Sequence, residues 1–245
     1  MVVRVFKFLL PGLVAGLLAM PAAALNLEER ADALMLDMLG LISSVRDYEA
    51  RFVVQTREAG RMRPPEAVYI KQRRSPSCIH TRWLDGPRKN AERVFCSEES
   101  ADNVTVRSRA RTLMNQKQLS RAQLTALQVV LRPVDDDGLY GMVARYANQY
   151  FDAAESVRQG DYKVEVRHAT VYERPVICLR LRRKHAVADA HYQGQTELCV
   201  DVKNKLPSAF RAWDARGELL ESYLIGDYRI NSGLQDSDFE LESAN

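Results

Sequence analysis

The chain has 245 residues, 46% of them hydrophobic, and a formal net charge of +3 from 35 Lys and Arg against 32 Asp and Glu. This length suits one domain or two small ones. The near-balance of charge argues against a nucleic-acid-binding protein, because such proteins usually carry a strong basic excess, and we expect no nucleic-acid partner.

The first 24 residues have the pattern of a secretory signal peptide. Arg4 and Lys7 precede an apolar run, and Ala22 and Ala24 occupy the two small-residue positions of an A-x-A cleavage site. The run is short and interrupted at Pro11, which disfavours the alternative of an uncleaved membrane anchor. We therefore predict cleavage after Ala24 and a periplasmic location for the mature protein.

The remainder, 25–245, is predicted to be a single domain. It holds 33 basic and 32 acidic residues, because the signal segment contains two basic residues and no acidic ones. Arginine is concentrated between residues 51 and 111, whereas the end of the chain is acidic. These charges either lie on solvated strand faces or form a basic rim for an anionic lipid or an acidic partner.

The domain begins with one predicted helix and two predicted strands. Between 27 and 45, apolar residues recur at helical spacing, which predicts an amphipathic helix. From Tyr48 to Arg57 the even positions are mostly apolar and the odd ones mostly polar, which is the period-two pattern of a half-buried strand. A turn near Gly60 leads to a second predicted strand over 66–73.

Two cysteines lie symmetrically about the turn at Asp85-Gly86-Pro87. If residues 78–83 and 92–96 form a hairpin around this turn, Cys78 and Cys96 face each other within reach of a disulfide. Four cysteines in an exported chain are more consistent with disulfides than with free thiols. The chain has no C-x-x-C, so neither a redox motif nor a zinc site is indicated.

The middle of the chain is predicted to be mainly helical. After a strand over 103–109, Ser120 is expected to cap a helix that Pro133 stops. A second helix is expected from Asp135 to about Val157, with acidic residues at its start, where the helix dipole favours them.

The last third returns to alternating patterns, which predict strands near 162–168, 177–182, 198–202, 209–213 and 219–230. Cys178 and Cys199 fall on the polar faces of two of these strands, and a loop near Ala188 lies midway between them. These positions predict a second hairpin, in which Cys178 and Cys199 face each other. Of the three possible pairings we favour Cys78–Cys96 and Cys178–Cys199.

The order helix, strands, helices, strands predicts an α+β fold: a strongly curved antiparallel β-sheet, or half-barrel, with helices covering its concave face. The apolar strand residues should share that concave face. They are Phe52, Val54, Val68, Ile70, Ile79, Trp83, Val164, Val166, Ile177, Leu179, Leu181, Leu198 and Val200. They either form an ordinary core that the helices fill or line a cavity open to a lipid or acyl chain.

Signatures of catalysis are sparse. The chain has no G-x-S-x-G, no H-E-x-x-H and no Gly-rich phosphate loop. His185, Asp189 and His191 lie close in sequence, but they fall in a predicted hairpin loop, where polar residues are expected anyway. We expect no enzyme activity, no metal and no cofactor.

Two motifs point to a family. The segment W-L-D-G-P-R-K-N-A-E-R-V at residues 83–94 and the closing G-L-Q-D-S-D-F at residues 233–239 resemble an uncharacterised bacterial family of domains of unknown function. That family is similar to the LolA/LolB superfamily of periplasmic lipoprotein carriers. The resemblance implies a half-barrel with a helical lid over a hydrophobic cavity, which agrees with the predicted order of elements.

The resemblance also implies a function. The leading hypothesis is a monomeric periplasmic carrier that binds the acyl chains of a lipid or lipoprotein in an apolar cavity, without catalysis. The alternative is an envelope-stress sensor or protein-interaction module of the same fold, with an inner- or outer-membrane protein as its partner.

Overall fold

The computed structural model describes residues 27–58, 60–97, 103–110, 113–120, 138–157, 162–183 and 194–241. The predicted signal peptide, including Ala22 and Ala24, lies outside these residues, as do most of the helix predicted after Ser120 and the His185 loop.

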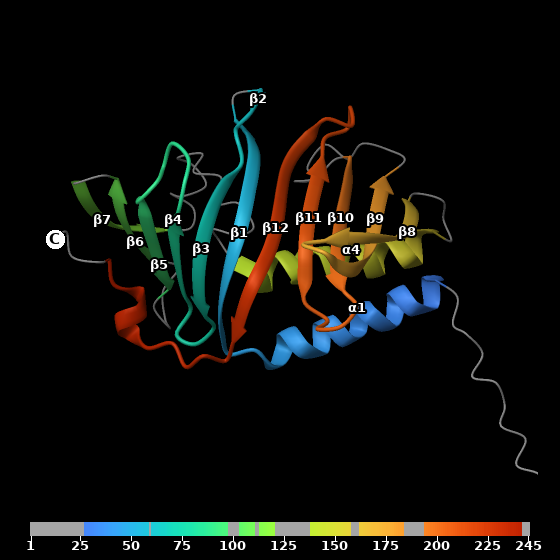
Figure 1. Cartoon of the computed structure of the whole chain (residues 1–245), viewed down its shortest axis with the longest axis horizontal. Coiled ribbons are helices and arrows are strands. Elements are labelled where there is room, and N and C mark those ends of the chain that lie inside the picture. The colour runs from blue at the N-terminus through green and yellow to red at the C-terminus, as the bar shows by residue number, and fades with distance from the viewer. Residues whose placement is uncertain are drawn as a thin grey trace, which may run out of the picture.

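One antiparallel sheet organises the described chain (Figure 1). Its strands follow the order β7-β6-β5-β4-β3-β1-β12-β11-β10-β9-β8, and the short β2 pairs with β1. The bounds are β1 Asp47–Glu58, β2 Arg61–Met62, β3 Glu66–Arg73, β4 Cys78–Trp83, β5 Glu92–Ser97, β6 Asn103–Ala110, β7 Leu113–Ser120, β8 Tyr162–Val171, β9 Arg174–Arg183, β10 Gln195–Asp201, β11 Pro207–Trp213 and β12 Leu219–Ile230.

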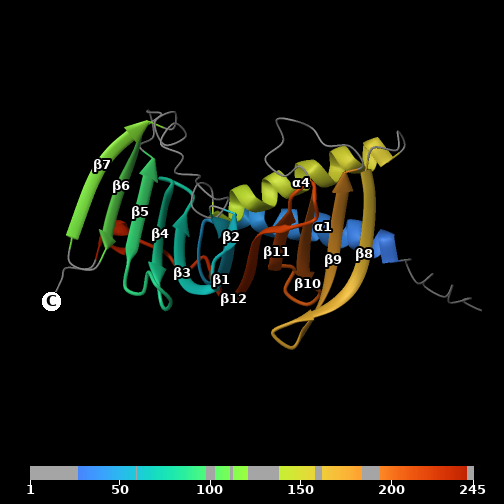
Figure 2. The same cartoon turned by 90° about the horizontal axis from the view of Figure 1, so that it is seen from above.

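Two helices lie on one side of this open sheet, the side toward which its ends bend (Figure 2). They are α1, Leu27–Ser44, and α4, Gly138–Val157; both lie over the half formed by β12 to β8, and the start of α4 reaches β1 and β3. This arrangement confirms the predicted fold class, although the described helices do not extend over β4 to β7. In the described residues no helix is long and apolar enough to cross a membrane.

Most strands form where the alternation of apolar and polar residues predicts them. In β1, for example, Tyr48, Phe52 and Val54 are buried beneath the helices. The prediction missed β7, which pairs with β6 along its whole length. The sequence of β7, LMNQKQLS, has weak alternation and no β-branched residue, so no strand signal stood out. Ser120, expected to begin a helix, instead ends this strand.

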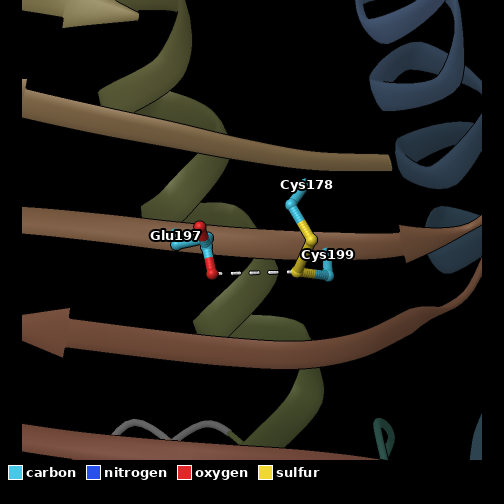
Figure 3. Close-up of side chains that lie close together, drawn as sticks. All are labelled: Cys178, Glu197 and Cys199. Atoms are coloured by element: carbon cyan, nitrogen blue, oxygen red, sulfur yellow. Dashed lines mark hydrogen bonds between the residues drawn. A yellow bond between two sulfur atoms is a disulfide. The ribbon is translucent and has the colours of Figure 1, made fainter. Parts of the chain in front are cut away.

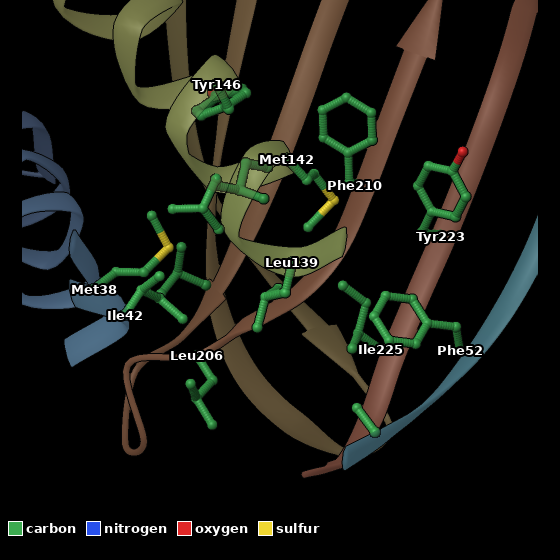
Figure 4. Close-up of a cluster of buried hydrophobic side chains, with 14 of the residues drawn as sticks. Met38, Ile42, Phe52, Leu139, Met142, Tyr146, Leu206, Phe210, Tyr223 and Ile225 are labelled. Carbon is green, nitrogen blue, oxygen red and sulfur yellow. The ribbon is translucent and has the colours of Figure 1, made fainter. Parts of the chain in front are cut away.

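The chain buries apolar side chains on both faces of the sheet. The large cluster lies between the sheet and the helices (Figure 4). On the other face, the end of the β8–β9 hairpin contributes Val171 and Val176 to a small cluster with Ala209. A second small cluster forms where Leu234 and Phe239 of the C-terminal segment pack over β4 and β5.

Each small cluster contains a disulfide, and both predicted pairings are present. Cys78 pairs with Cys96 at an S–S distance of 1.96 Å, and Cys178 with Cys199 at 2.02 Å. In both cases the two cysteines are direct cross-strand partners, as the symmetry about the turns predicted. The disulfides therefore staple neighbouring strands and indicate an oxidising compartment.

We expect removal of one disulfide to destabilise the fold measurably. The double variant Cys178→Ala/Cys199→Ala should lose about 3 kcal/mol of unfolding free energy, because the crosslink restricts the unfolded chain. Urea denaturation of the variant and of the oxidised wild type measures this difference. An unchanged unfolding free energy would show that the crosslink does not stabilise the fold.

Candidate functional site

The apolar interior between the sheet and the helices is the candidate site. In α1, Leu34, Met35, Met38 and Ile42 point into it, and in α4, Leu139, Met142, Val143, Tyr146 and Tyr150 do so. Figure 4 shows side chains from both helices meeting those of the sheet, such as Phe210 and Tyr223. Methionine side chains are flexible and polarizable, so this interior can adapt to a change of contents more readily than one of branched residues.

All thirteen residues predicted to share the concave face belong to this interior. Eleven are buried in it, and Val164 and Val166 are partly buried and pack against it. The structure therefore brings together the whole predicted set. Contact of these side chains with a ligand stays a prediction.

Buried tyrosines position α4 over the sheet. The N–H of Leu139 donates a hydrogen bond of 3.0 Å to the hydroxyl of Tyr48, and the hydroxyl of Tyr146 donates one of 2.5 Å to the carbonyl of Leu179. Burial raises the pKa of Tyr48 well above its usual value, so it stays neutral. These directional bonds set the place of the helix, and apolar packing fills the space between them.

The start of α4 depends on a glycine. Gly138 has a φ of +54°, and a Cβ at this position would lie 2.0 Å from Oε1 of Gln72 in β3. The backbone conformation favours glycine here, and a larger residue would in addition have to move the end of the Gln72 side chain.

A cleft opens between the two helices at this end of α4. Its volume is about 490 Å³, and its apolar walls are Leu39 and Ile42 of α1 and Tyr140 and Val143 of α4. Ile42 and Val143 also belong to the buried interior, so the cleft shares its walls with that interior. The cleft therefore borders the apolar interior from the outside.

A cation and an aromatic ring meet at the cleft. Arg74 donates hydrogen bonds of 2.9 Å to the carbonyls of Ser43 and Ile42, at the end of α1. Its guanidinium lies 4.4 Å from the centre of the Tyr140 ring. Burial raises the pKa of Tyr140 to about 12. The positive charge of Arg74 lowers this pKa and the negative charge of Asp47 raises it, but burial has the largest effect. Arg74 thus holds the end of α1 close to the start of α4.

Sequence reasoning did not find this cleft. None of the thirteen predicted residues lines it, because the prediction considered strands only. The apolar positions of α1, including Leu39 and Ile42, were visible as a helical stripe, but their meeting with Tyr140 depends on tertiary structure. Arg74, which directly follows β3, had no distinguishing pattern around it.

The opposite face holds the one group of described residues whose ligand atoms are close enough to bind a metal: Cys178, Glu197 and Cys199 (Figure 3). The two sulfurs are joined in a disulfide and so offer no thiolate. Sγ of Cys199 lies 4.0 Å from Oε1 of Glu197, a contact in which the oxidised sulfur has no proton to donate. These three residues are therefore a structural cluster.

Glu197 is instead the centre of an arginine cluster. Its fully buried carboxylate accepts bonds of 2.9 Å from Arg167, Arg180 and Arg211, which come from β8, β9 and β11. Burial raises the pKa of Glu197, but the bonds from Arg167 and Arg211 and the charge of Arg180 outweigh it, so the pKa lies below its usual value. One carboxylate thus links four strands.

The variant Glu197→Gln should be clearly destabilised. Breaking a buried ion pair costs about 3–5 kcal/mol of unfolding free energy. The three arginine side chains are 25–47% exposed, so solvent screens the pairs, and we expect a loss of about 2 kcal/mol. The control is Glu218→Gln, because Glu218 pairs with Arg57 at a more exposed position, and should cost about 0–1 kcal/mol. Equal losses in the two variants, measured by urea denaturation, would contradict this role of Glu197.

The contribution of Glu197 should also depend on pH. Its folded pKa is lower than its unfolded value of about 4.3, so its stabilisation is complete above that value and is lost as pH falls through the folded pKa. The difference in unfolding free energy between wild type and Glu197→Gln should therefore be constant from pH 6 to about 5 and shrink below about pH 4. A difference that persists unchanged at pH 3 would refute the assignment.

The comparisons place the chain in a family. The family described as "Protein of unknown function (DUF1571)" matches residues 45–245. The chain belongs to this family. The match extends from just before β1 to the end of the chain and so confirms the resemblance to a domain of unknown function. None of the curated proteins matches the chain.

Several solved structures share the general fold of this DUF1571 protein. The Pseudomonas aeruginosa MucA/MucB complex has 17% identity and a TM-score of 0.47, over 86% of this chain and 61% of that one. Lipoprotein LppX of Mycobacterium tuberculosis has 7% identity and a TM-score of 0.47, over 83% and 98%. A LolA superfamily protein of Nitrosomonas europaea has 11% identity and a TM-score of 0.35, over 85% and 98%. At these values the likenesses carry no argument about function.

Proposed function

We propose that this DUF1571 protein is a periplasmic lipid- or lipoprotein-binding carrier without catalytic activity. The observation that carries the proposal is the apolar cleft between α1 and α4, whose walls Ile42 and Val143 continue into the buried interior. An acyl chain entering there would exchange contacts with water for contacts with aliphatic and aromatic side chains, at roughly 25 cal/mol per Å² of apolar surface buried.

The location in the periplasm rests on two observations. The chain starts with the pattern of a cleavable signal peptide, ending at Ala22 and Ala24. The two disulfides need an oxidising compartment to form and persist. Both agree with a carrier that works between membranes.

In the proposed mechanism the two helices act as the movable wall. α1 contacts α4 through the Tyr150 hydroxyl, which donates to Asp32, and through Arg74, which holds the end of α1. In the proposed movement both of these links break as the helices separate. The thirteen strand residues would then contact the acyl chain, and the methionines of the helices would adapt to its shape.

The alternative is an envelope-stress sensor or protein-interaction module. The tight burial of the interior, with Leu139, Met142 and Tyr146 almost fully covered, is the observation that favours it. In that case the helices would stay closed, and a membrane protein would bind the outer surface.

A bulky residue in the cleft tests the carrier proposal. Ala144 lines the cleft, so Ala144→Trp should fill part of its volume and weaken binding of a fluorescent fatty acid at least tenfold. Asn148→Trp is the control, because Asn148 is also exposed on α4 but does not line the cleft. If wild type binds no fatty acid, or if both variants bind it equally well, the proposed use of the cleft is wrong.

A further inference from the structure

A second hollow lies on the face of the sheet opposite the helices. Its volume is about 770 Å³, and its lining includes Arg51, Val53, Tyr172, Arg174, Leu206 and Asp227. We call it the Arg51 hollow. Arg51 and Val53 alternate along β1 with the core residues Phe52 and Val54, which places the hollow on the outer face.

The β8–β9 hairpin builds one wall of the hollow. Its end reaches across β10 and β11 toward β12 (Figures 1 and 2), and the ring of Tyr172 lies 3.3 Å from where a Cβ of Gly226 would be. The Cys178–Cys199 disulfide and the small cluster around Val176 fix the same hairpin to β10. The wall is therefore held by covalent and apolar contacts.

A tight hairpin turn and a bulge shape the backbone around the hollow. Tyr172, Glu173 and Asp227 have φ values of +48°, +60° and +54°, in the left-handed region that non-glycine residues rarely occupy. The register between β1 and β12 shifts here, since Glu49 pairs with Arg229 but Arg51 pairs with Gly226, which makes a bulge at Asp227. Tyr172 and Glu173 are the two central residues of the tight β8–β9 turn, in which positive φ is the normal geometry, and Asp227 belongs to the bulge.

The hollow brings together the charged side chains of Arg51, Arg174 and Asp227 with the ring of Tyr172. Burial raises the pKa of Tyr172, the positive charges of Arg51 and Arg174 lower it, and the negative charge of Asp227 raises it. Two cations and one anion face the same space.

Arg51 and Arg174 have guanidinium N–H groups that the described chain does not use as hydrogen-bond donors. Arg51 is exposed and makes no hydrogen bond or ion pair with the described part of the chain. Arg174 faces the buried carboxylate of Asp201 through Nε, at 3.6 Å. That contact orients Arg174 and leaves its two terminal nitrogens for a ligand. Guanidinium groups bind phosphate and carboxylate with two parallel hydrogen bonds, so a pair of them forms a specific oxyanion site.

We propose that the Arg51 hollow binds a zwitterionic ligand in which a phosphate or carboxylate is close to an ammonium group. The oxyanion lies between Arg51 and Arg174, and the ammonium pairs with Asp227. The apolar part of the ligand packs against Val53 and Leu206. A simple anion fits less well, because Asp227 would repel it and the Asp201 carboxylate already offsets the charge of Arg174.

The source of such a group is either the head of a phospholipid or a free small molecule. Calorimetric titration of the mature protein should use glycerophosphoethanolamine, inorganic phosphate and ethanolamine as probes. We expect glycerophosphoethanolamine to bind at least tenfold more tightly than either half alone. Flotation with phosphatidylethanolamine vesicles then separates the sources: Arg51-dependent co-flotation assigns the lipid head, and its absence assigns the free molecule.

Matched variants make the test specific. Arg51→Gln and Asp227→Asn should each weaken glycerophosphoethanolamine binding about tenfold, because each removes one charged hydrogen-bonding partner. The control is Arg57→Gln, in the same strand, whose partner is Glu218 outside the hollow. Three results would each overturn the proposal. The first is no binding at millimolar concentrations of the probe, and the second is phosphate binding as tight as that of glycerophosphoethanolamine. The third is unchanged binding in Arg51→Gln and Asp227→Asn. Because none of these variants touches the cleft, fatty-acid binding should persist in all of them.

Discussion

The structure depends on the packing of two helices against one face of an open sheet. An open sheet has two faces, and among the described residues the large apolar core lies on the face under α1 and α4. The tyrosine bonds to Leu139 and Leu179 set where α4 lies, and hydrophobic burial provides most of the free energy. Because the helices are separate from the sheet, the interior they close can in principle be opened without unpairing a strand.

The outer face is stabilised by different means. Here the clusters are small, and covalent and ionic links add to them: two cross-strand disulfides and the Glu197 carboxylate, which joins Arg167, Arg180 and Arg211. The Cys178–Cys199 disulfide and the Glu197 cluster link β8 to β11 without the helices, and the Cys78–Cys96 disulfide links β4 to β5. A crosslinked sheet beneath two separate helices agrees with the carrier function that we propose.

Much of this architecture could be predicted from local patterns. The period-two alternation placed most strands, and the symmetry of Cys78 and Cys96 about a turn gave both the hairpin and its register. What could not be predicted depends on strands that are distant in sequence. The arginines around Glu197 come from three strands whose register has no local signal, and the cleft needs α1 and α4 to meet. β7 was missed because its sequence favours no regular pattern.

The most direct test of the carrier account is native mass spectrometry of the mature protein purified from periplasm, before and after organic extraction. The account predicts an added mass that extraction removes and that is identified as a lipid or an acylated peptide. A ligand-free mass that reproducibly equals that of the chain with two disulfides, together with a stoichiometric protein partner, would contradict it and favour the interaction module.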